Sequence, residues 1–301
     1  MKIDFHTHIF PDSLAAKAIA ELQKAEGLPA YTEGTAASLL ASSQRADVGI
    51  SVVLPVVTKP TQSSRVNDDA IRYNERFVHW LEENKDKIRC QEKQTVANAS
   101  ADTEPILYSF GGLHPDNEDY KEQIDTLYRN GVKGIKLHPV FQLTYFDDIR
   151  YMRMIDYASE KGMYINVHAG RDINRPRAEH SAVDHLIPVL KELKPPKLIL
   201  AHMGGWNCWD IVEEMLEEYK PYVDTSFCLY REDEQPSFFT PMSVDSFRRC
   251  VRSVGCEKVI FGTDSPWTDQ EESLILLRKA CENEEQFEQI TFKNGFDILT
   301  K

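Results

Sequence analysis

The sequence opens with MKIDFHTHIF (residues 1–10), in which a short run rich in apolar residues is followed by two histidines separated by one residue. An open doubly wound sheet usually carries a glycine-rich fingerprint after its first strand, and none follows this run. Further short apolar runs recur along the chain, and longer amphipathic stretches separate most of them. This alternation predicts a parallel sheet with helical crossovers, and eight such strands favour a closed (β/α)8 TIM barrel of the α/β class.

The expected strands have β-branched or aromatic residues at their centres. They span residues 2–6, 50–56, 106–114, 134–138, 163–168, 197–202, 221–226 and 258–264. Helical patterns cover residues 118–129, 149–160, 183–193, 211–219, 244–254 and 270–280. Two long connections, residues 11–34 and 58–102, contain further helical segments, the second over residues 68–84. We expect these insertions to shape the mouth of the barrel.

Composition indicates a globular chain, and we expect one domain over residues 1–301. The hydrophobic fraction is 42% and the charged fraction 28%, both near the averages for globular proteins. A net charge of −13 disfavours nucleic acid as a partner. No apolar run is long enough to cross a membrane, and the first residues do not resemble a signal peptide. A cytoplasmic protein without a membrane partner is therefore expected.

Side chains alternate between the two faces of a strand, so His6 and His8 should point the same way. The same alternation predicts that Asp4 lies behind them inside the barrel, and that Ile3 and Phe5 face the surrounding helices. Two imidazoles would then converge within the barrel.

Three further polar residues lie at the ends of later strands. Alternation places His168 and Asp264 inward, and His202 inward together with Leu198 and Leu200. Barrel active sites are built at the C-terminal ends of the strands. These residues should therefore meet His6 and His8 around one point.

Imidazole nitrogens and carboxylate oxygens suit Zn²⁺ and similar divalent ions. The candidate ligands are therefore His6, His8, His168, His202 and Asp264. An ion with an open coordination position would lower the pKa of a bound water to about 7, which makes a nucleophile available at neutral pH.

The motifs MKIDFHTHIF, VHAG, LAHMGG and FGTDSPW resemble those of the amidohydrolase superfamily, with the closest likeness to amidohydrolase family 2, the aminocarboxymuconate-semialdehyde-decarboxylase-like proteins. The likeness extends nearly to the end of the chain. It implies a metal-dependent enzyme with one or two ions, in which His6, His8 and His168 are metal ligands and Asp264 is both a ligand and the base that activates water. It also implies that His202 is either a ligand of a second metal or an acid/base residue.

Lys136 should face inward at the end of the fourth strand, with His138. Many relatives carry a carboxylated lysine there that bridges two metals. Alternatively, Lys136 could bind a substrate carboxylate or pair with a buried acid such as Asp224.

Candidate substrate-binding residues follow the strand ends. His114 and His138 each precede a proline and either line the pocket or have a structural role. Arg171 follows the fifth strand and could bind a carboxylate or phosphate, unless it is a solvated loop residue. Trp206 and Trp267 adjoin two of the motifs and could form a wall of the pocket.

The favoured function is metal-dependent hydrolysis of an amide, lactone or related ester of a small, carboxylated molecule. A nonhydrolytic decarboxylase or hydratase of the same family is the enzymatic alternative, and a noncatalytic metal-binding barrel is the alternative from another class. A small-molecule substrate is the expected partner, and the resemblance makes a homodimer plausible.

Overall fold

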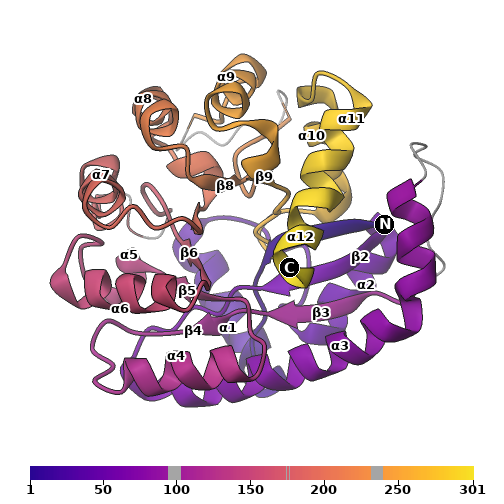
Figure 1. Cartoon of the computed structure of the whole chain (residues 1–301). Coiled ribbons are helices and arrows are strands. Elements are labelled where there is room, and N and C mark those ends of the chain that lie inside the picture. The colour runs from indigo at the N-terminus through magenta and orange to yellow at the C-terminus, as the bar shows by residue number, and fades with distance from the viewer. Residues whose placement is uncertain (94–102, 174, 176, 232–239) are drawn as a thin grey trace.

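A computed structural model describes residues 1–93, 103–173, 175, 177–231 and 240–301. Its strands are parallel and form the barrel that the alternation of apolar runs predicts (Figure 1). In chain order they are β1 (Lys2–Thr7), β2 (Val48–Val53), β3 (Ile106–Ser109), β4 (Gly111–Gly112), β5 (Gly134–Leu137), β6 (Tyr164–Val167), β7 (Leu198–Leu200), β8 (Tyr222–Asp224) and β9 (Val259–Ile260).

Backbone hydrogen bonds join two ladders, β1-β2-β3 and β4 to β9, into one closed sheet. Between β3 and β4, the N–H of Phe110 donates to the carbonyl of Val53 in β2 (3.0 Å). β3 and β4 are therefore two parts of one interrupted strand of the barrel. At the other seam, the N–H of Phe5 donates to the carbonyl of Phe261 (2.8 Å), and that of Asp264 donates to the carbonyl of His6 (2.8 Å). The segment that continues β9 is thereby hydrogen-bonded to β1, which closes the barrel.

The helices lie around the barrel, mostly where the amphipathic patterns predict them (Figure 1). The pattern over residues 68–84 belongs to a longer helix, α3, and the short helix α2 was not expected from the sequence. The helices are α1 (Asp12–Glu26), α2 (Ala36–Ala46), α3 (Ser63–Lys93), α4 (Tyr120–Arg129), α5 (Pro139–Gln142), α6 (Ile149–Glu160), α7 (Val183–Glu192), α8 (Trp209–Tyr219), α9 (Val244–Val254), α10 (Gln270–Ala280), α11 (Glu284–Glu288) and α12 (Asn294–Thr300).

Apolar side chains from distant strands fill the lower part of the barrel. They belong to one buried cluster, which residues of α3 and α12 also join. Phe5 and Phe110 lie on strands that do not neighbour one another in the sheet, and their ring centroids are 5.5 Å apart, which places both side chains inside the barrel. The strand residues of this cluster include Ile3, Phe5, Ile50, Val52, Phe110, Ile199 and Ile260.

The predicted orientation of the first half of β1 was wrong, because the strand contains an irregularity. The pairing register with β2 shifts between Asp4 and Thr7, and such a bulge changes which face the following residues take. Ile3 and Phe5 therefore point into the barrel. Asp4 points outward and accepts a hydrogen bond from Gln270 of α10 (2.8 Å).

Strict alternation also fails at the end of β7. Leu198 and Leu200 pack in the cluster of the surrounding helices, while Ile199 points inward. His202 nevertheless reaches the site, because it is no longer in the strand. It begins the 3-10 turn η2 (His202–Gly204) with a left-handed φ of 57°.

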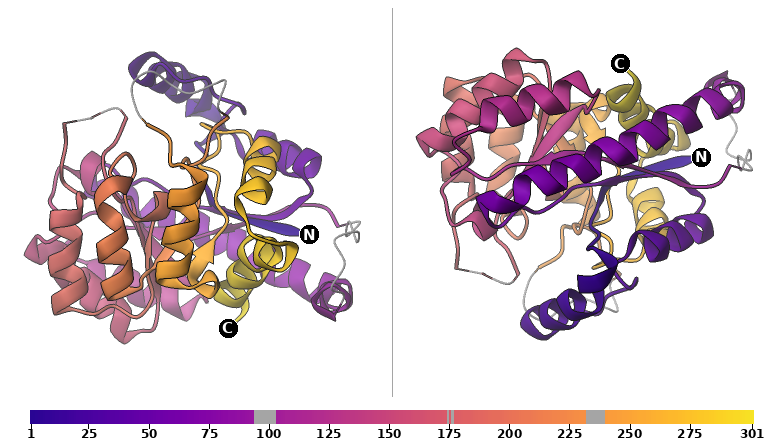
Figure 2. Two further views of the ribbon diagram at one scale, coloured as in Figure 1. Left: turned by 90° about the horizontal axis from the view of Figure 1, so that it is seen from above. Right: turned by 90° about the horizontal axis from the view of Figure 1, so that it is seen from below.

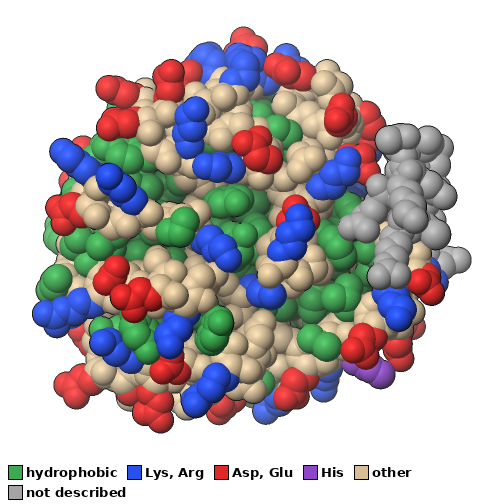
Figure 3. Space-filling model, in the orientation of Figure 1, with side chains coloured by type: hydrophobic (Ala, Val, Ile, Leu, Met, Phe, Trp, Pro, Cys, Tyr) green, Lys and Arg blue, Asp and Glu red, His purple; other side chains and the backbone are tan. Residues whose placement is uncertain are grey.

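Two segments extend over the mouth of the barrel. Figure 2 shows α1 standing away from the ring of helices, and the N-terminal part of α3 lines the same cavity as α1. On the face seen in Figure 3, acidic and basic side chains are interspersed without a large area of one sign. Within the ranges that the structure describes, no helix is both long and apolar enough to cross a membrane.

Candidate metal centre

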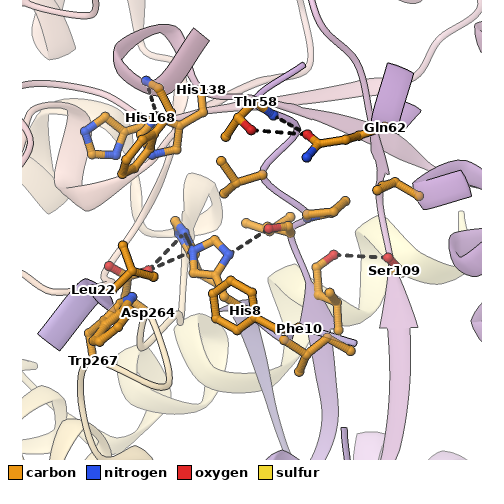
Figure 4. Close-up of a pocket in the computed structure, with 18 of the residues that line it drawn as sticks. His8, Phe10, Leu22, Thr58, Gln62, Ser109, His138, His168, Asp264 and Trp267 are labelled. Atoms are coloured by element: carbon orange, nitrogen blue, oxygen red, sulfur yellow. Dashed lines mark hydrogen bonds and ion pairs between the residues drawn. The ribbon is translucent and has the colours of Figure 1, made fainter. Parts of the chain in front are cut away.

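A cavity of about 790 Å³ opens at the C-terminal ends of the strands. Five polar residues that the sequence predicts for the site line this cavity: His6, His8, His168, His202 and Asp264. Figure 4 labels His8, His168 and Asp264 among them. The bulge in β1 brings His6 and His8 to one side of it, and loops after β6, β7 and β9 supply the others. The walls around them are largely apolar.

His6 and His8 each have one ring nitrogen bonded to a protein acceptor. Nδ1 of His6 lies 2.9 Å from a carboxylate oxygen of Asp224, and Nδ1 of His8 lies 2.7 Å from the carbonyl oxygen of Leu54. Since an ionised carboxylate and a carbonyl can only accept, both Nδ1 atoms carry the hydrogen. The two Nε2 atoms therefore present lone pairs, and they lie 3.2 Å apart.

Asp264 completes the first group of potential ligands. Its Oδ1 atom lies 2.9 Å from Nε2 of His8 and 3.5 Å from Nε2 of His6. Burial alone would raise the pKa of Asp264, but its contacts with the imidazoles of His8 and His6 hold it below its ordinary value. Burial lowers the pKa of His6 to about 3, so this imidazole is neutral. These atoms match a divalent cation.

His168 and His202 form a second pair of the same kind. Nε2 of His168 donates to the carbonyl of Arg171 (2.9 Å), and Nδ1 of His202 donates to the carbonyl of Ser226 (3.1 Å). The remaining nitrogens, Nδ1 of His168 and Nε2 of His202, lie 3.1 Å apart. Burial lowers the pKa of both imidazoles. Two neutral nitrogens at this distance could both coordinate one cation.

The two pairs lie side by side, since the rings of His6 and His202 are 5.1 Å apart. His168 is not in the close group of His6, His8 and Asp264, whose ligand atoms all lie within 4.8 Å of one another. Its available nitrogen instead faces His202. The donor set fits one ion at the first group, with room for a second at the histidine pair.

Lys136 lies buried beside the ligands. Its Nζ donates to Oδ1 of Asn166 (2.8 Å) and lies 3.5 Å from Nε2 of His6. Burial lowers the pKa of Lys136 to about 8. Its hydrogen bond goes to an amide and not to Asp224, the buried acid considered as its partner.

Asp224 has a positioning role that the sequence did not suggest. Its carboxylate accepts hydrogen bonds from Nδ1 of His6 (2.9 Å), from the N–H of His202 (3.0 Å), and from both the N–H and the hydroxyl of Ser226. Because these bonds occupy its oxygens, Asp224 is better placed to orient ligands than to be one. Asp224 entered the sequence-based expectations only as a buried acid that could pair with Lys136.

His138 lies on the cavity wall beside His168 and Asp172. The rings of His138 and His168 stack at 4.3 Å with an angle of 12°, so their lone pairs cannot converge on one ion. Nδ1 of His138 accepts from the N–H of Phe141 (3.4 Å), which leaves an N–H at Nε2, 3.8 Å from the Asp172 carboxylate. His138 thus has an N–H on the cavity wall that can donate a hydrogen bond.

The other predicted substrate-binding residues occupy different positions. Trp267 lines the cavity, as does Trp206. Arg171 is exposed and His114 is buried, and neither is on the cavity wall. The carbonyl of Arg171 holds His168, whereas Nδ1 of His114 accepts from the N–H of Asp116 (3.2 Å). Substrate binding by their side chains stays a prediction.

Barrel and site together define the class, a TIM barrel with a metal-ligand set at its mouth. The sequence profile of the amidohydrolase family, amidohydrolase family 2, matches residues 3–294, and the chain belongs to this family. The family is metal-dependent. None of the curated proteins gives a significant match.

Solved structures share the fold at low sequence identity. An uncharacterised TIM-barrel protein from Bordetella bronchiseptica has a TM-score of 0.69 at 13% identity, covering 99% of this chain and 98% of that chain. For 2,6-dihydroxybenzoate decarboxylase from Rhizobium the TM-score is 0.61 at 13% identity, with coverages of 99% and 98%. For a putative 2-pyrone-4,6-dicarboxylic acid hydrolase from Pseudomonas putida it is 0.58 at 15% identity, with coverages of 99% and 97%.

Proposed function

We propose that this chain is a zinc-dependent hydrolase of a small amide, lactone or related ester. The observation that carries the proposal is the set of four imidazoles, each with one nitrogen bonded to a protein acceptor and the other available, beside the carboxylate of Asp264. Neutral imidazole and carboxylate ligands without thiolates are typical of catalytic zinc sites.

The ion would be held by His6, His8 and Asp264, with His168 and His202 available for a second. When bound, it polarises a carbonyl and makes water more acidic. Asp264 accepts the proton of the attacking water and returns it to the nitrogen or oxygen of the leaving group as that atom's bond to the carbonyl carbon breaks. His138 donates through Nε2 to a substrate oxygen.

Nonhydrolytic decarboxylation is the second candidate. The largely apolar wall favours it, because loss of carbon dioxide from a carboxylate proceeds better where water is scarce. Fold neighbours with decarboxylase and hydrolase names both occur, and at these identities they support either reaction equally.

Product analysis separates the two reactions. Zinc-loaded protein would be incubated in isotopically labelled water with panels of lactones, amides, esters and aryl carboxylic acids. We expect label to appear in a new carboxyl group. Release of carbon dioxide from an aryl acid, without label in the product, would instead establish the decarboxylase.

A further inference from the structure

The outer wall of the cavity carries polar groups that the proposed chemistry does not use. Arg65 lies in the first turn of α3, and Gln62 lies three residues before it; both side chains line the cavity. Among the described residues on this wall, Arg65 is the only lysine or arginine.

Neither side chain has its donors engaged within the described ranges. Arg65 makes no ion pair there, and the acid one helical turn further on, Asp69, is paired with Arg72. The Gln62 side chain accepts at Oε1 from the N–H groups of Thr58 (2.8 Å) and Lys59 (3.1 Å). The Gln62 amide is thereby fixed, and its NH2 group is left to donate.

One continuous segment connects these donors to the metal ligands. It begins at Leu54, whose carbonyl holds His8, and continues through Pro55 and Val56 along the wall. Figure 4 shows Gln62 on the side of the cavity away from Asp264. A small molecule that contacts both the metal-binding residues and Arg65 would therefore be elongated. Its middle would lie against the apolar side chains of this segment and would itself be apolar.

We propose that Arg65, supported by Gln62, binds an anionic group at the end of the substrate remote from the reacting carbon. This inference rests on the proposed function and narrows its substrate to an elongated amphiphilic acid. A guanidinium fork and an amide NH2 are both donors, and they suit a carboxylate. Asp12 and Asp69 lie on the same wall, so a singly charged carboxylate fits better than a doubly charged phosphate.

Binding of simple probes tests Arg65 without a known substrate. Calorimetry on zinc-loaded protein would compare suberate and sebacate with octanoate and decanoate, which match them in length but lack the second carboxylate. We expect the dicarboxylates to bind more tightly. Arg65→Gln should weaken their binding about ten-fold and leave the monocarboxylates unchanged. Arg65→Lys should restore part of the loss.

Arg76→Gln, on the same helix but outside the cavity wall, controls for the change in charge. The proposal is overturned if no dicarboxylate binds more tightly than its matched monocarboxylate, or if both arginine variants weaken binding equally. Repeating the titration on metal-free protein separates the two claims. Equal monocarboxylate binding with and without zinc counts against the metal-site function, whereas an Arg65-dependent preference that persists supports the proposal.

Discussion

Each imidazole at the barrel mouth has its tautomer set by an oxygen of the protein. The acceptors are the Asp224 carboxylate and the carbonyls of Leu54, Arg171 and Ser226. The sequence could predict the histidines because they lie in recognisable strand-end motifs. It could not predict three of these acceptors, because a backbone carbonyl carries no signature of residue type.

Substitution of Asp264 by asparagine separates metal binding from proton transfer. The amide can still coordinate through its oxygen but cannot act as a base near neutral pH. Asp264→Asn should keep some metal and lose a factor of about 10²–10⁴ in kcat, with a smaller effect on substrate affinity. Steady-state kinetics of metal-loaded protein would measure this loss.

The matched control is Asp156→Asn, at an exposed position in the middle of α6. Thr263, the neighbour of Asp264, is unsuitable as a control position, because its hydroxyl donates a hydrogen bond to the buried Asp4 (2.6 Å). A near-normal kcat for metal-loaded Asp264→Asn would exclude this carboxylate as the base and assign the role to His202.

Asp224 should affect metal affinity without touching the metal. Asp224→Ala removes the acceptor that fixes the tautomer of His6, so we expect metal affinity to fall about 10- to 100-fold. Competition with a chromogenic chelator would measure the change, with Asp156→Ala as the control. Unchanged affinity would show that His6 needs no such partner.

At the scale of elements, strands and helices were predictable because hydrophobic periodicity is local, and α6, α9 and α10 have the expected bounds. Whether a given strand side chain points into or out of the barrel was less predictable. The register shift between Asp4 and Thr7 in β1 and the left-handed backbone at His202 each change the side to which the following side chains point. Both occur where the chain leaves a regular strand to form the site.

The side chain of Asp4 in β1 points out of the barrel and has a structural role there. Its buried carboxylate accepts from the N–H of His6, from the N–H and hydroxyl of Thr263, and from the amide of Gln270. Asp4→Ala leaves these donors unsatisfied and should lower the free energy of unfolding by about 3 kcal/mol. Urea denaturation would measure this, with Asp156→Ala as a control expected to change little. Equal stability of the two variants would refute the role.

At the scale of the whole molecule, the closed barrel gathers ligands that are separated by more than half of the chain. The fold was predictable from the strand count and strand-end motifs, since each motif appears at the end of its own strand. The pocket wall was not, because α1 and the start of α3 come together only in three dimensions. Arg65 was missed for that reason.

Metal content tests the central claim most directly. Purified protein and a His6→Ala/His8→Ala double variant would be analysed for bound metal by mass spectrometry, with His79→Ala, an exposed helical histidine, as the control. We predict at least one equivalent of divalent metal, most of it zinc, in the native and His79→Ala proteins. The double variant should contain little metal and keep a native circular dichroism spectrum. Full metal occupancy in the double variant would contradict the assignment.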